Sequence, residues 1–588
     1  MISPPAAMAG AAARAFAKVF ARTFAASAHA TGADLRELRA AKTAIRDPAH
    51  RALAEEILAL VRDDKKLDQV EVAPARRALA GLLDLGSSRL PMALERALHN
   101  AVPRANASVR RYELRFDVST ERPDIPARAL IRLAGNAHDE LILEVAPARL
   151  RIEEVRAGRR LAPFHVRGER LHVKAPGASA IAVRYTVRST EDPNGYGLIR
   201  DPRTGTYSTF TWPYHTGALF PSNSSPSDGV TTRVTVKAGR GRRVVGAGTA
   251  GQGPIRVDKP VPAYAIAFYA GRFTRERPLV SKSGITVTAH GHGASVRPDV
   301  RRGYQRAAAE AIDFFSAWLG PYAYGTRFAL VEVGGSLGCM ENAGAAAMMI
   351  GAIQGRDEAR EMAVHEVAHH WFGDNLRIRN SGEFWMSEGF TNYLTYRFFG
   401  HRDGAHALAA RLDRGKRLVE AALRHREHLL EGPSYSDVRE IFTDVPYELG
   451  PWILRMMETA VGTRRFDQML AAWYRAHRFS AVDTSEFLAF AKRRTGRDFG
   501  ALFERWSRIT AVPSFEDRSA IDGDRAHVAL RARTAMPDGL VIPLIVEGER
   551  GQRKTVAIDP RARASVDAGF RVKRLCWDPE RHVLAHVE

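Results

Sequence analysis

Residues 365–369 read HEVAH and residues 385–390 read WMSEGF, so that eighteen residues separate His369 from Glu388. On a helix, His365 and His369 stand at positions i and i+4, where their rings leave the same face and can share one ion. Glu388, on a second helical stretch, offers a carboxylate as the third ligand. Three protein ligands leave one position of a zinc ion open, which is typical of catalytic rather than structural sites. The spacing therefore predicts two packed helices around one catalytic Zn²⁺ per chain.

Glu366 follows the first histidine directly. At that position it can reach a water molecule on the metal without binding the metal itself. A bare His-Glu-x-x-His also arises by chance on amphipathic helices. Here the flanks argue against chance, because residues 361–373 read as a buried helix that ends at a glycine and residues 388–399 read as another aromatic helix.

Composition limits the class of protein. The chain has 588 residues, of which 45% are hydrophobic, enough for three or four domains. It contains no run of 18 apolar residues, so no membrane span is expected. The formal charge of +21 is compatible with a nucleic-acid or anionic partner. A general arginine bias explains it better, because no basic stripe and no nucleic-acid motif is present, and we expect no nucleic-acid partner.

The two cysteines, Cys339 and Cys576, fall in different predicted domains, which makes a disulfide framework improbable and favours a cytoplasmic location. Residues 1–33 are alanine-rich and free of acids. Basic residues interrupt their apolar run, which weakens the signal-peptide interpretation, although residues 28–30 resemble a cleavage site. Export and a basic amphipathic helix on a membrane surface are the alternatives. A frayed leader is the favoured interpretation, and the oligomeric state is left open.

Apolar periodicity divides the chain. From Asp34 to about Asn100 apolar residues recur at three- and four-residue steps, which predicts a helical extension. Asp47 and Pro48 are a cap and first turn of one of its helices. This extension carries no readable function.

The period changes to two near residue 108, where Tyr112, Leu114 and Phe116 alternate with polar residues. Further strand-like runs occupy residues 129–133, 141–145, 171–173, 181–185 and 264–269. Helical patterns return from residue 300 and continue to about Trp506, with one strand at 328–333. After Pro513 the chain alternates again, for example at Ala526, Val528 and Leu530 and at Val541, Pro543 and Ile545.

Residues 338–342 read GCMEN and follow the predicted strand at 328–333. A carboxylate such as Glu341 near a hydrolytic zinc can hold the ammonium group of a substrate. The glycine lets an extended peptide lie close to the backbone, so Gly338, Met340 and Asn342 are candidate substrate-binding residues. Taken alone, the pentapeptide would read as a turn with a solvated acid; the zinc pattern nearby favours the functional interpretation.

Tyr447 lies 59 residues after Glu388, in the sequence PYELG. A phenol has an unperturbed pKa of about 10 and is a neutral donor at pH 7. It can therefore stabilise the oxyanion of a tetrahedral intermediate. A tyrosine before a helix is more often a packing residue, so the spacing by itself supports this role weakly.

These motifs together resemble the aminopeptidase N family of gluzincin metallopeptidases, which includes the leukotriene hydrolases. The strong motifs occupy residues 338–450, and weaker similarity extends over about residues 110–588. The resemblance implies a multidomain α+β fold with an N-terminal β saddle domain, a thermolysin-like and mainly helical catalytic domain and a small C-terminal β-sandwich. The expected boundaries are 1–107 for the helical extension, 108–275 for the β domain, 276–511 for the catalytic domain and 512–588 for the sandwich.

The resemblance also implies residue roles. His365, His369 and Glu388 would bind zinc, and Glu366 would be the general base. Glu341 would anchor the free amine of the substrate, and Tyr447 would donate to the transition state.

Three departures from the family pattern stand out. Leu449 stands where many members have lysine, and His370 and Asp374 replace residues that are more often glutamine and asparagine. No clear copy of the motif that supplies a second amine-binding acid is present, and residues 209–212 read TFTW nearby. Glu341 is therefore expected to act alone at the amine.

We expect a zinc-dependent aminopeptidase that hydrolyses the N-terminal bond of peptides through a metal-activated water. Zinc would lower the pKa of that water to about 7, and Glu366 would move its proton to the leaving amine. The alternatives are endopeptidase or epoxide hydrolase chemistry on the same metal, or a catalytically silent zinc-binding protein.

Overall fold

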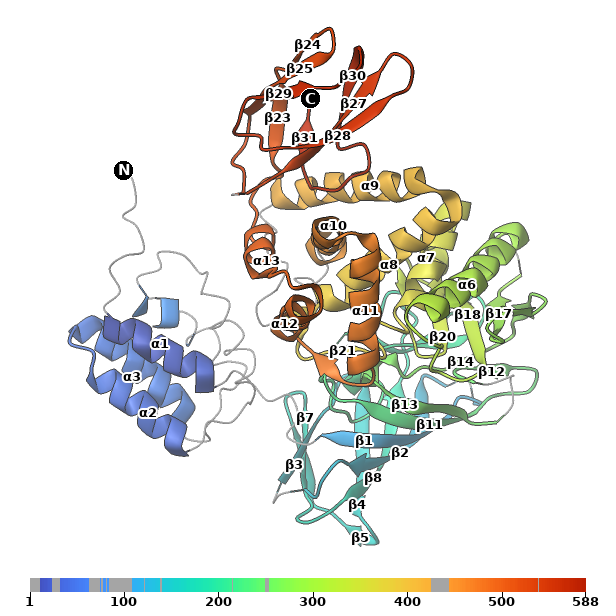
Figure 1. The fold of residues 1–588 in the computed structure, drawn as a ribbon. Coiled ribbons are helices and arrows are strands. Elements are labelled where there is room, and N and C mark those ends of the chain that lie inside the picture. The colour runs from blue at the N-terminus through green and yellow to red at the C-terminus, as the bar shows by residue number, and fades with distance from the viewer. Residues whose placement is uncertain are drawn as a thin grey trace. The chain divides into compact units, whose positions relative to one another are not determined.

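The computed structural model (Figure 1) describes residues 11–23, 32–62, 75, 78–80, 82–83, 108–120, 122–137, 140–213, 215–248, 253–293, 295–424, 444–537 and 539–588. The chain divides into a small helical unit before residue 107 and a large unit that follows it. Among the helices of these residues, none is both long and apolar enough to cross a lipid bilayer.

The small unit contains α1 (Ala11–Thr23), α2 (Gly32–Thr43) and α3 (Pro48–Arg62). Phe16 and Phe20 of α1 are fully buried and belong to one apolar cluster with Leu38 and Ile57. The expectation of a frayed leader is therefore wrong for residues 11–23, because their aromatic and alanine side chains form a stripe that packs on the other helices.

Asp47 caps α3 as predicted. Its Oδ1 accepts a hydrogen bond from the backbone N–H of His50 at 2.8 Å, and Pro48 occupies the first turn. Residues 1–10, residues 24–31 and most of the predicted helical stretch after residue 62 lie outside the described residues.

The large unit begins with a seven-stranded sheet of order β13-β11-β1-β2-β8-β4-β5. Its strands are β1 (Val109–Asp117), β2 (Asp124–Leu133), β4 (Leu150–Ala157), β5 (Arg160–Leu161), β8 (Ala180–Arg188), β11 (Val230–Lys237) and β13 (Ile255–Val261). Tyr112, Leu114 and Phe116 of β1 are buried, whereas the residues between them are exposed or half-buried. The predicted period of two is confirmed.

Two smaller sheets complete this part, with orders β3-β7-β6 and β12-β14-β10-β9. Their strands are β3 (Glu140–Glu144), β6 (Phe164–Arg167), β7 (Arg170–Lys174), β9 (Gly197–Arg200), β10 (Tyr207–Phe210), β12 (Arg243–Val245) and β14 (Tyr269–Gly271).

The predicted strand over residues 264–269 is wrong. Ala263–Ala265 is a short 3-10 turn, and β14 starts only at Tyr269. The Tyr264 carbonyl accepts hydrogen bonds from the side chains of Thr211, at 3.0 Å, and Asn342, at 3.4 Å. Side chains thus donate the hydrogen bonds that the Tyr264 carbonyl would receive from a neighbouring strand if this segment were part of a sheet.

A mixed sheet of order β15-β17-β18-β20-β19, with β16 paired to β17, follows in the chain. Its strands are β15 (Thr274–Arg275), β16 (Leu279–Val280), β17 (Thr286–Gly291), β18 (Arg327–Val333), β19 (Cys339–Met340) and β20 (Ala345–Met349). The strand predicted at 328–333 is confirmed as β18. β19 runs antiparallel to β20 at the edge of the sheet, so the GCMEN sequence lies at this edge.

Helices form most of the remainder of this region (Figure 1), together with one parallel pair of short strands, β21 (Arg377–Ile378) and β22 (Ala481–Val482). The helices are α6 (Pro298–Trp318), α7 (Arg356–Ala368), α8 (Trp385–Asp403), α9 (Ala405–Arg424), α10 (Gly450–Val461), α11 (Thr463–His477), α12 (Thr484–Thr495) and α13 (Gly500–Trp506). Helix α8 approaches α10 most closely where two glycines meet. A Cβ on Gly389 would lie 3.0 Å from Gly450 Cα, and a Cβ on Gly450 would lie 2.7 Å from Gly389 Cα. This contact brings the residues around Glu388 and Tyr447 together.

The chain ends in short strands: β23 (Ser514–Asp517), β24 (Ala520–Asp522), β25 (Arg525–Val528), β26 (Leu530–Ala532), β27 (Ile542–Gly548), β28 (Arg553–Ile558), β29 (Ala564–Asp567), β30 (Val572–Trp577) and β31 (His586–Val587). The buried positions of β27 are Ile542, Leu544 and Val546. The alternation read at Val541, Pro543 and Ile545 therefore marks the outer face. The residues on both sides of this segment are apolar, so the alternation in sequence does not show which side is buried. The multidomain α+β class is confirmed, whereas the exact domain boundaries stay a prediction.

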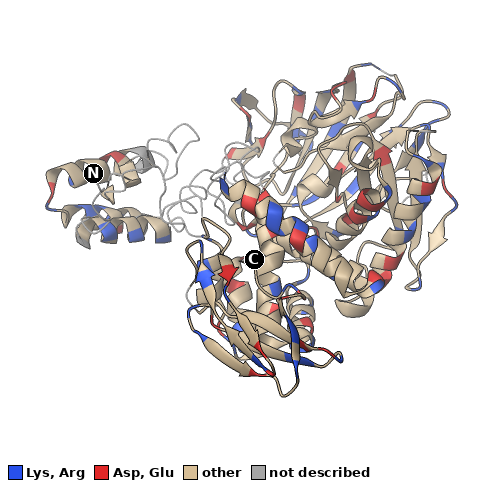
Figure 2. Cartoon of the chain, turned by 90° about the horizontal axis from the view of Figure 1, so that it is seen from above, with Lys and Arg blue, Asp and Glu red and all other residues tan. Residues whose placement is uncertain are grey.

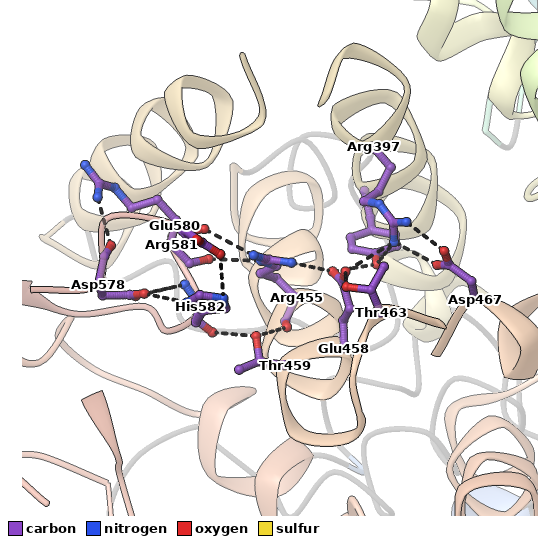
Figure 3. A network of polar contacts seen from close by, with 11 residues as sticks. Arg397, Arg455, Glu458, Thr459, Thr463, Asp467, Asp578, Glu580, Arg581 and His582 are labelled. Carbon is purple, nitrogen blue, oxygen red and sulfur yellow. Dashed lines mark hydrogen bonds and ion pairs between the residues drawn. The ribbon is translucent and has the colours of Figure 1, made fainter. Parts of the chain in front are cut away.

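Acidic and basic residues are interspersed along the same helices and strands (Figure 2). One buried group of such charges, shown in Figure 3, lies around Glu458 of α10. Its carboxylate accepts hydrogen bonds from Thr463 at 2.7 Å and pairs with Arg455 at 2.8 Å and Arg397 at 3.5 Å. Arg455 also donates to the backbone carbonyl of Arg581 at 3.1 Å, which ties α10 to the C-terminal segment. Burial acts to raise the pKa of Glu458, but the two guanidinium groups lower it below its usual value.

Replacing Glu458 with alanine should leave two guanidinium groups in a buried site without their shared anion. We expect a loss of about 3 kcal/mol in the free energy of unfolding, measured as a shift of the urea midpoint by circular dichroism. Glu504→Ala, at an exposed position, is the matched control and should shift the midpoint little. Equal shifts for the two variants would contradict the importance of the Glu458 group.

A second buried acid, Glu448, lies between α8 and α9. Its Oε2 accepts a hydrogen bond from the Tyr396 hydroxyl at 2.7 Å, and a Cβ on Gly415 of α9 would lie 2.4 Å from the same oxygen. Burial raises the pKa of Glu448 to about 8, although Tyr396 and Arg414 counteract the rise. The folded chain therefore favours the neutral carboxyl group.

Because the pKa of Glu448 is higher in the folded than in the unfolded chain, its contribution to stability is lost as the pH rises from its ordinary value of 4.5 through about 8. Glu448→Gln keeps a neutral side chain at every pH. The stability of this variant relative to the wild type should increase across that window, by at most about 1.4 kcal/mol per pH unit. Urea unfolding at several pH values measures the difference, and Glu504→Gln should give a flat profile. A difference that does not change with pH would show that Glu448 is already ionised when folded.

Candidate active site

Two helices bring the predicted metal ligands together. His365 and His369 leave one face of α7, and their Nε2 atoms lie 3.0 Å apart. Glu388, in the first turn of α8, places Oε2 at 3.2 Å from each of these nitrogens. All three side chains are buried. The two Nε2 atoms and the Glu388 Oε2 atom thus form a compact triangle of possible metal-binding atoms.

The other ring nitrogens determine which atoms face the centre of this triangle. His365 Nδ1 lies 2.7 Å from Asn392 Oδ1, and His369 Nδ1 lies 3.1 Å from the Phe372 carbonyl. Both partners are hydrogen-bond acceptors, so each Nδ1 carries the proton when the imidazole is neutral. The Nε2 lone pairs are then directed at the shared point, the arrangement found for metal-binding histidines.

Charges in the cluster favour a cation at the same point. Burial acts to raise the pKa of Glu388, but His369 and His365 lower it to about 2. Burial acts to lower the pKa of His369, but Glu388 and Glu341 raise it to about 10. The surrounding carboxylates therefore stabilise a positive charge strongly, whether it is a proton or a metal ion.

This donor set fits Zn²⁺. Two imidazole nitrogens and a carboxylate oxygen are ligands that zinc prefers, and they satisfy three of its four positions. Glu388 Oε2 is fully buried, yet no hydrogen bond from the described residues reaches it. A buried carboxylate oxygen without a donor is costly, and a bound cation would remove that cost. His365, His369 and Glu388 are therefore the residues that would hold the ion.

A pocket of about 330 Å³ opens onto the triangle. Glu366 lies in its wall and is 3% exposed. Burial, together with the carboxylates of Glu341 and Glu388, raises the pKa of Glu366 well above its ordinary value despite the opposing charge of His369. Its carboxyl group thus has a high affinity for a proton in this dry environment.

The GCMEN sequence lines another part of the pocket. Gly338, Met340 and Glu341 are in its wall, and burial raises the pKa of Glu341. Asn342 is not among the lining residues. Its amide donates to the Tyr264 carbonyl and accepts a hydrogen bond from the Tyr269 hydroxyl at 2.8 Å, so it supports the loop from behind.

Tyr447 lies in the helical turn Val445–Leu449 and also lines the pocket. Its ring centroid is 6.4 Å from that of His365. Burial and the nearby carboxylates, first that of Glu388, raise the pKa of Tyr447 well above its ordinary value, so the phenol keeps its proton. Leu449, the departure from the family motif, is buried in the helical core and not in the pocket wall.

The sequence interpretation missed several residues of this site. Asn392 binds His365 through Oδ1 and donates from Nδ2 to the Tyr447 carbonyl at 2.8 Å, so it joins a metal ligand to the tyrosine. Its position four residues after Glu388, on the same helical face, was a usable signal. Phe210 and Trp212, in the TFTW stretch where no amine-binding acid was found, line the pocket from the β-rich part of the unit.

The chain is similar to known proteins in both sequence and fold. Residues 306–506 match the model of the peptidase family M1 domain. The tricorn protease-interacting factor F2 of Thermoplasma acidophilum is 25% identical over 220 residues, which cover 35% of this chain and 28% of that protein. Aminopeptidase B of Rattus norvegicus is 25% identical over 395 residues, which cover 60% of this chain and 58% of that protein. The match thus spans well under two thirds of the length of either relative.

The fold is also similar to that of Legionella pneumophila aminopeptidase A, solved in complex with aspartic acid. The TM-score is 0.68 at 17% sequence identity, and the alignment covers 82% of this chain and 59% of that one. The family model covers both helices that carry these side chains, and the similar structure agrees with the multidomain α+β fold. The chain is therefore similar to peptidase family M1 over residues 306–506, the region that carries His365, His369 and Glu388.

Proposed function

We propose that this protein is a zinc-dependent aminopeptidase that removes the N-terminal residue of peptides. The observation that carries the proposal is the presence of the buried Glu341 carboxylate in the same pocket as the His365, His369 and Glu388 triangle. An acid so placed can bind the ammonium group at the end of a peptide and bring the first peptide bond to the metal. The names of two similar proteins, aminopeptidase B and aminopeptidase A, agree with this activity.

Glu366 carries out both proton transfers of the proposed reaction. When bound, Zn²⁺ supplies Lewis acidity that polarises the scissile carbonyl and acidifies a water molecule. A carboxylate oxygen of Glu366 accepts the proton of that water as the water attacks the carbonyl carbon. Glu366 then delivers the proton to the nitrogen of the departing amine. Its raised pKa strengthens the carboxylate as a base in the first transfer.

Tyr447 is suited to stabilise the negative charge that develops on the carbonyl oxygen. Its hydroxyl stays protonated and can donate a hydrogen bond to that oxygen in the transition state. Asn392 acts as a positioning residue, because its amide holds both the Tyr447 backbone and the His365 ring. The helix contact at Gly389 and Gly450 keeps the two segments in register.

Substrate backbone binding is assigned to the edge strand β19. Gly338 has no heavy atom within 4 Å of the position of a Cβ, so the backbone there is open to a ligand. An extended peptide that lies along Gly338–Met340 would continue the sheet in the manner of β-strand addition. Glu341, directly after this strand, would then meet the peptide's N-terminus.

The purified chain should contain about one equivalent of zinc, measured by inductively coupled plasma mass spectrometry. Glu388→Gln removes the charged ligand and should lose most of the metal, whereas Glu366→Gln should retain it. Removal of zinc by a chelator should lower the thermal midpoint, because a ligand bound to the folded state stabilises it. A chain that neither contains nor takes up zinc would exclude the proposed centre.

Glu366→Gln should reduce kcat by about 10³-fold, because the amide cannot take a proton from water. Tyr447→Phe should reduce kcat by about 10²-fold with little change in KM, because its hydrogen bond forms mainly in the transition state. Both variants should keep zinc and the wild-type thermal midpoint. Full activity in Glu366→Gln would refute the role of Glu366 as the base.

A panel of aminoacyl-coumarin amides, each prepared with a free and an N-acetylated amine, tests the exopeptidase assignment. The wild type should hydrolyse the free amines and lose activity with a chelator. Glu341→Ala should lower kcat/KM for free amines by about 10²-fold or more and change the low activity on acetylated amides much less. Efficient cleavage of acetylated substrates would instead favour an endopeptidase on the same zinc.

A further inference from the structure

We propose that the amine subsite beside Glu341 selects peptides whose N-terminal nitrogen is alkylated, such as those with an N-methylated residue or proline at the first position. The inference rests on the proposed aminopeptidase function and adds a substrate class to it. It follows from the joint presence of a buried Glu341 oxygen that accepts no hydrogen bond from the described residues and the aromatic walls of Phe210 and Trp212.

The aromatic residues line the same pocket as Glu341. Phe210 and Trp212 line the pocket and are 5% and 4% exposed. Thr211, between them, donates to the Tyr264 carbonyl, and so does Asn342, the neighbour of Glu341. The two segments therefore meet at one backbone group. Burial and the adjacent Glu341 carboxylate also raise the pKa of the Tyr264 hydroxyl, so this residue contacts both segments.

Both rings are supported by other aromatic side chains. Phe210 stacks on Tyr196 with ring centroids 5.6 Å apart. Trp212 packs on Phe384 at 5.3 Å, and Phe384 in turn packs on Tyr447 at 5.8 Å. The wall beside the amine subsite is thus continuous with the aromatic group that reaches the catalytic tyrosine.

Among the described residues that line the pocket, few carboxylates are available to an ammonium group. Glu341 Oε1 is fully buried and accepts no hydrogen bond from the described residues. Two other acids of the pocket are engaged: Glu361 pairs with Arg411 and Arg414, and Glu448 accepts from Tyr396. Glu366 and Glu388 belong to the metal centre. Asp444 is the remaining lining carboxylate, and its effect is measured in the experiment below.

The chemistry of the nitrogen decides which substrate fits. A primary ammonium has three N–H donors and would leave at least one of them against an aromatic wall, which costs affinity by about tenfold or more. A secondary ammonium has the same charge and one donor fewer. Its alkyl group would pack on Trp212 and Phe210, and the cation would lie against the π-faces, as in aromatic sites for alkylated ammonium groups.

Matched substrates test the inference on the zinc-loaded full-length chain. We compare kcat/KM for alanyl- and N-methylalanyl-coumarin amides in the wild type, Trp212→Phe, Trp212→Glu and Asp444→Asn. The wild type should hydrolyse the N-methyl substrate at least as well as the primary amine. Trp212→Phe and Asp444→Asn should keep that ratio, whereas Trp212→Glu, which adds an acceptor, should shift it about tenfold or more toward the primary amine. A wild type that favours the primary amine by tenfold, or a ratio that Asp444→Asn moves and Trp212→Glu does not, would overturn the proposal.

Binding separates this inference from the aminopeptidase proposal. Calorimetry on Glu366→Gln with alaninamide and N-methylalaninamide needs no turnover. Tighter binding of the methylated amide, together with no hydrolysis by the wild type, would sustain the subsite and refute the peptidase. Hydrolysis of primary amines alone, with weaker binding of the methylated amide, would support the aminopeptidase and refute the subsite for alkylated amines. If Trp212→Glu does not fold by circular dichroism, Trp212→Leu replaces it, and an unchanged binding ratio in that variant would overturn the inference.

Discussion

A buried carboxylate and two buried imidazoles that point at one another favour a shared cation, and this cluster joins α8 to the end of α7. Glu388 Oε2 and the two Nε2 atoms lie within 3.2 Å of each other, where lone pairs repel and water is largely excluded. The low pKa of Glu388 and the high pKa of His369 express the same preference for positive charge. A metal ion satisfies it with three strong bonds, and its loss would leave the site poorly paired.

The helices and strands next to these three side chains form the pocket around them. The contact between Gly389 and Gly450 allows α8 and α10 to touch at their backbones, and Asn392 links the first histidine to the tyrosine segment. On the other side, the edge strand β19 presents an open backbone next to Glu341. The β-rich part contributes the aromatic wall. The residues proposed to bind the metal, the oxyanion and the amine therefore come from parts of the chain that are far apart in sequence.

Sequence reasoning succeeded where a short pattern has a fixed geometric meaning. The four-residue spacing of His365 and His369 placed both rings on one helical face, and the alternation in β1 identified a half-buried strand. It failed where the pattern was uniform. Residues 264–269 are buried throughout, so no alternation showed that they form a turn, and in β27 both faces are apolar. Asn342 was expected to contact substrate, yet its amide supports the loop behind the pocket, because the Tyr264 carbonyl competes for it.

By itself, the sequence indicated the α+β class and predicted three metal ligands and a neighbouring base, because these predictions depend on short spacings and on the periodicity of single elements. Only the tertiary structure decided that Phe210 and Trp212 form a wall of the pocket and that Asn392 joins His365 to Tyr447. It also decided that Leu449 faces the helical core. These relations join segments that lie tens to hundreds of residues apart, and packing between elements, rather than any local periodicity, brings them into contact.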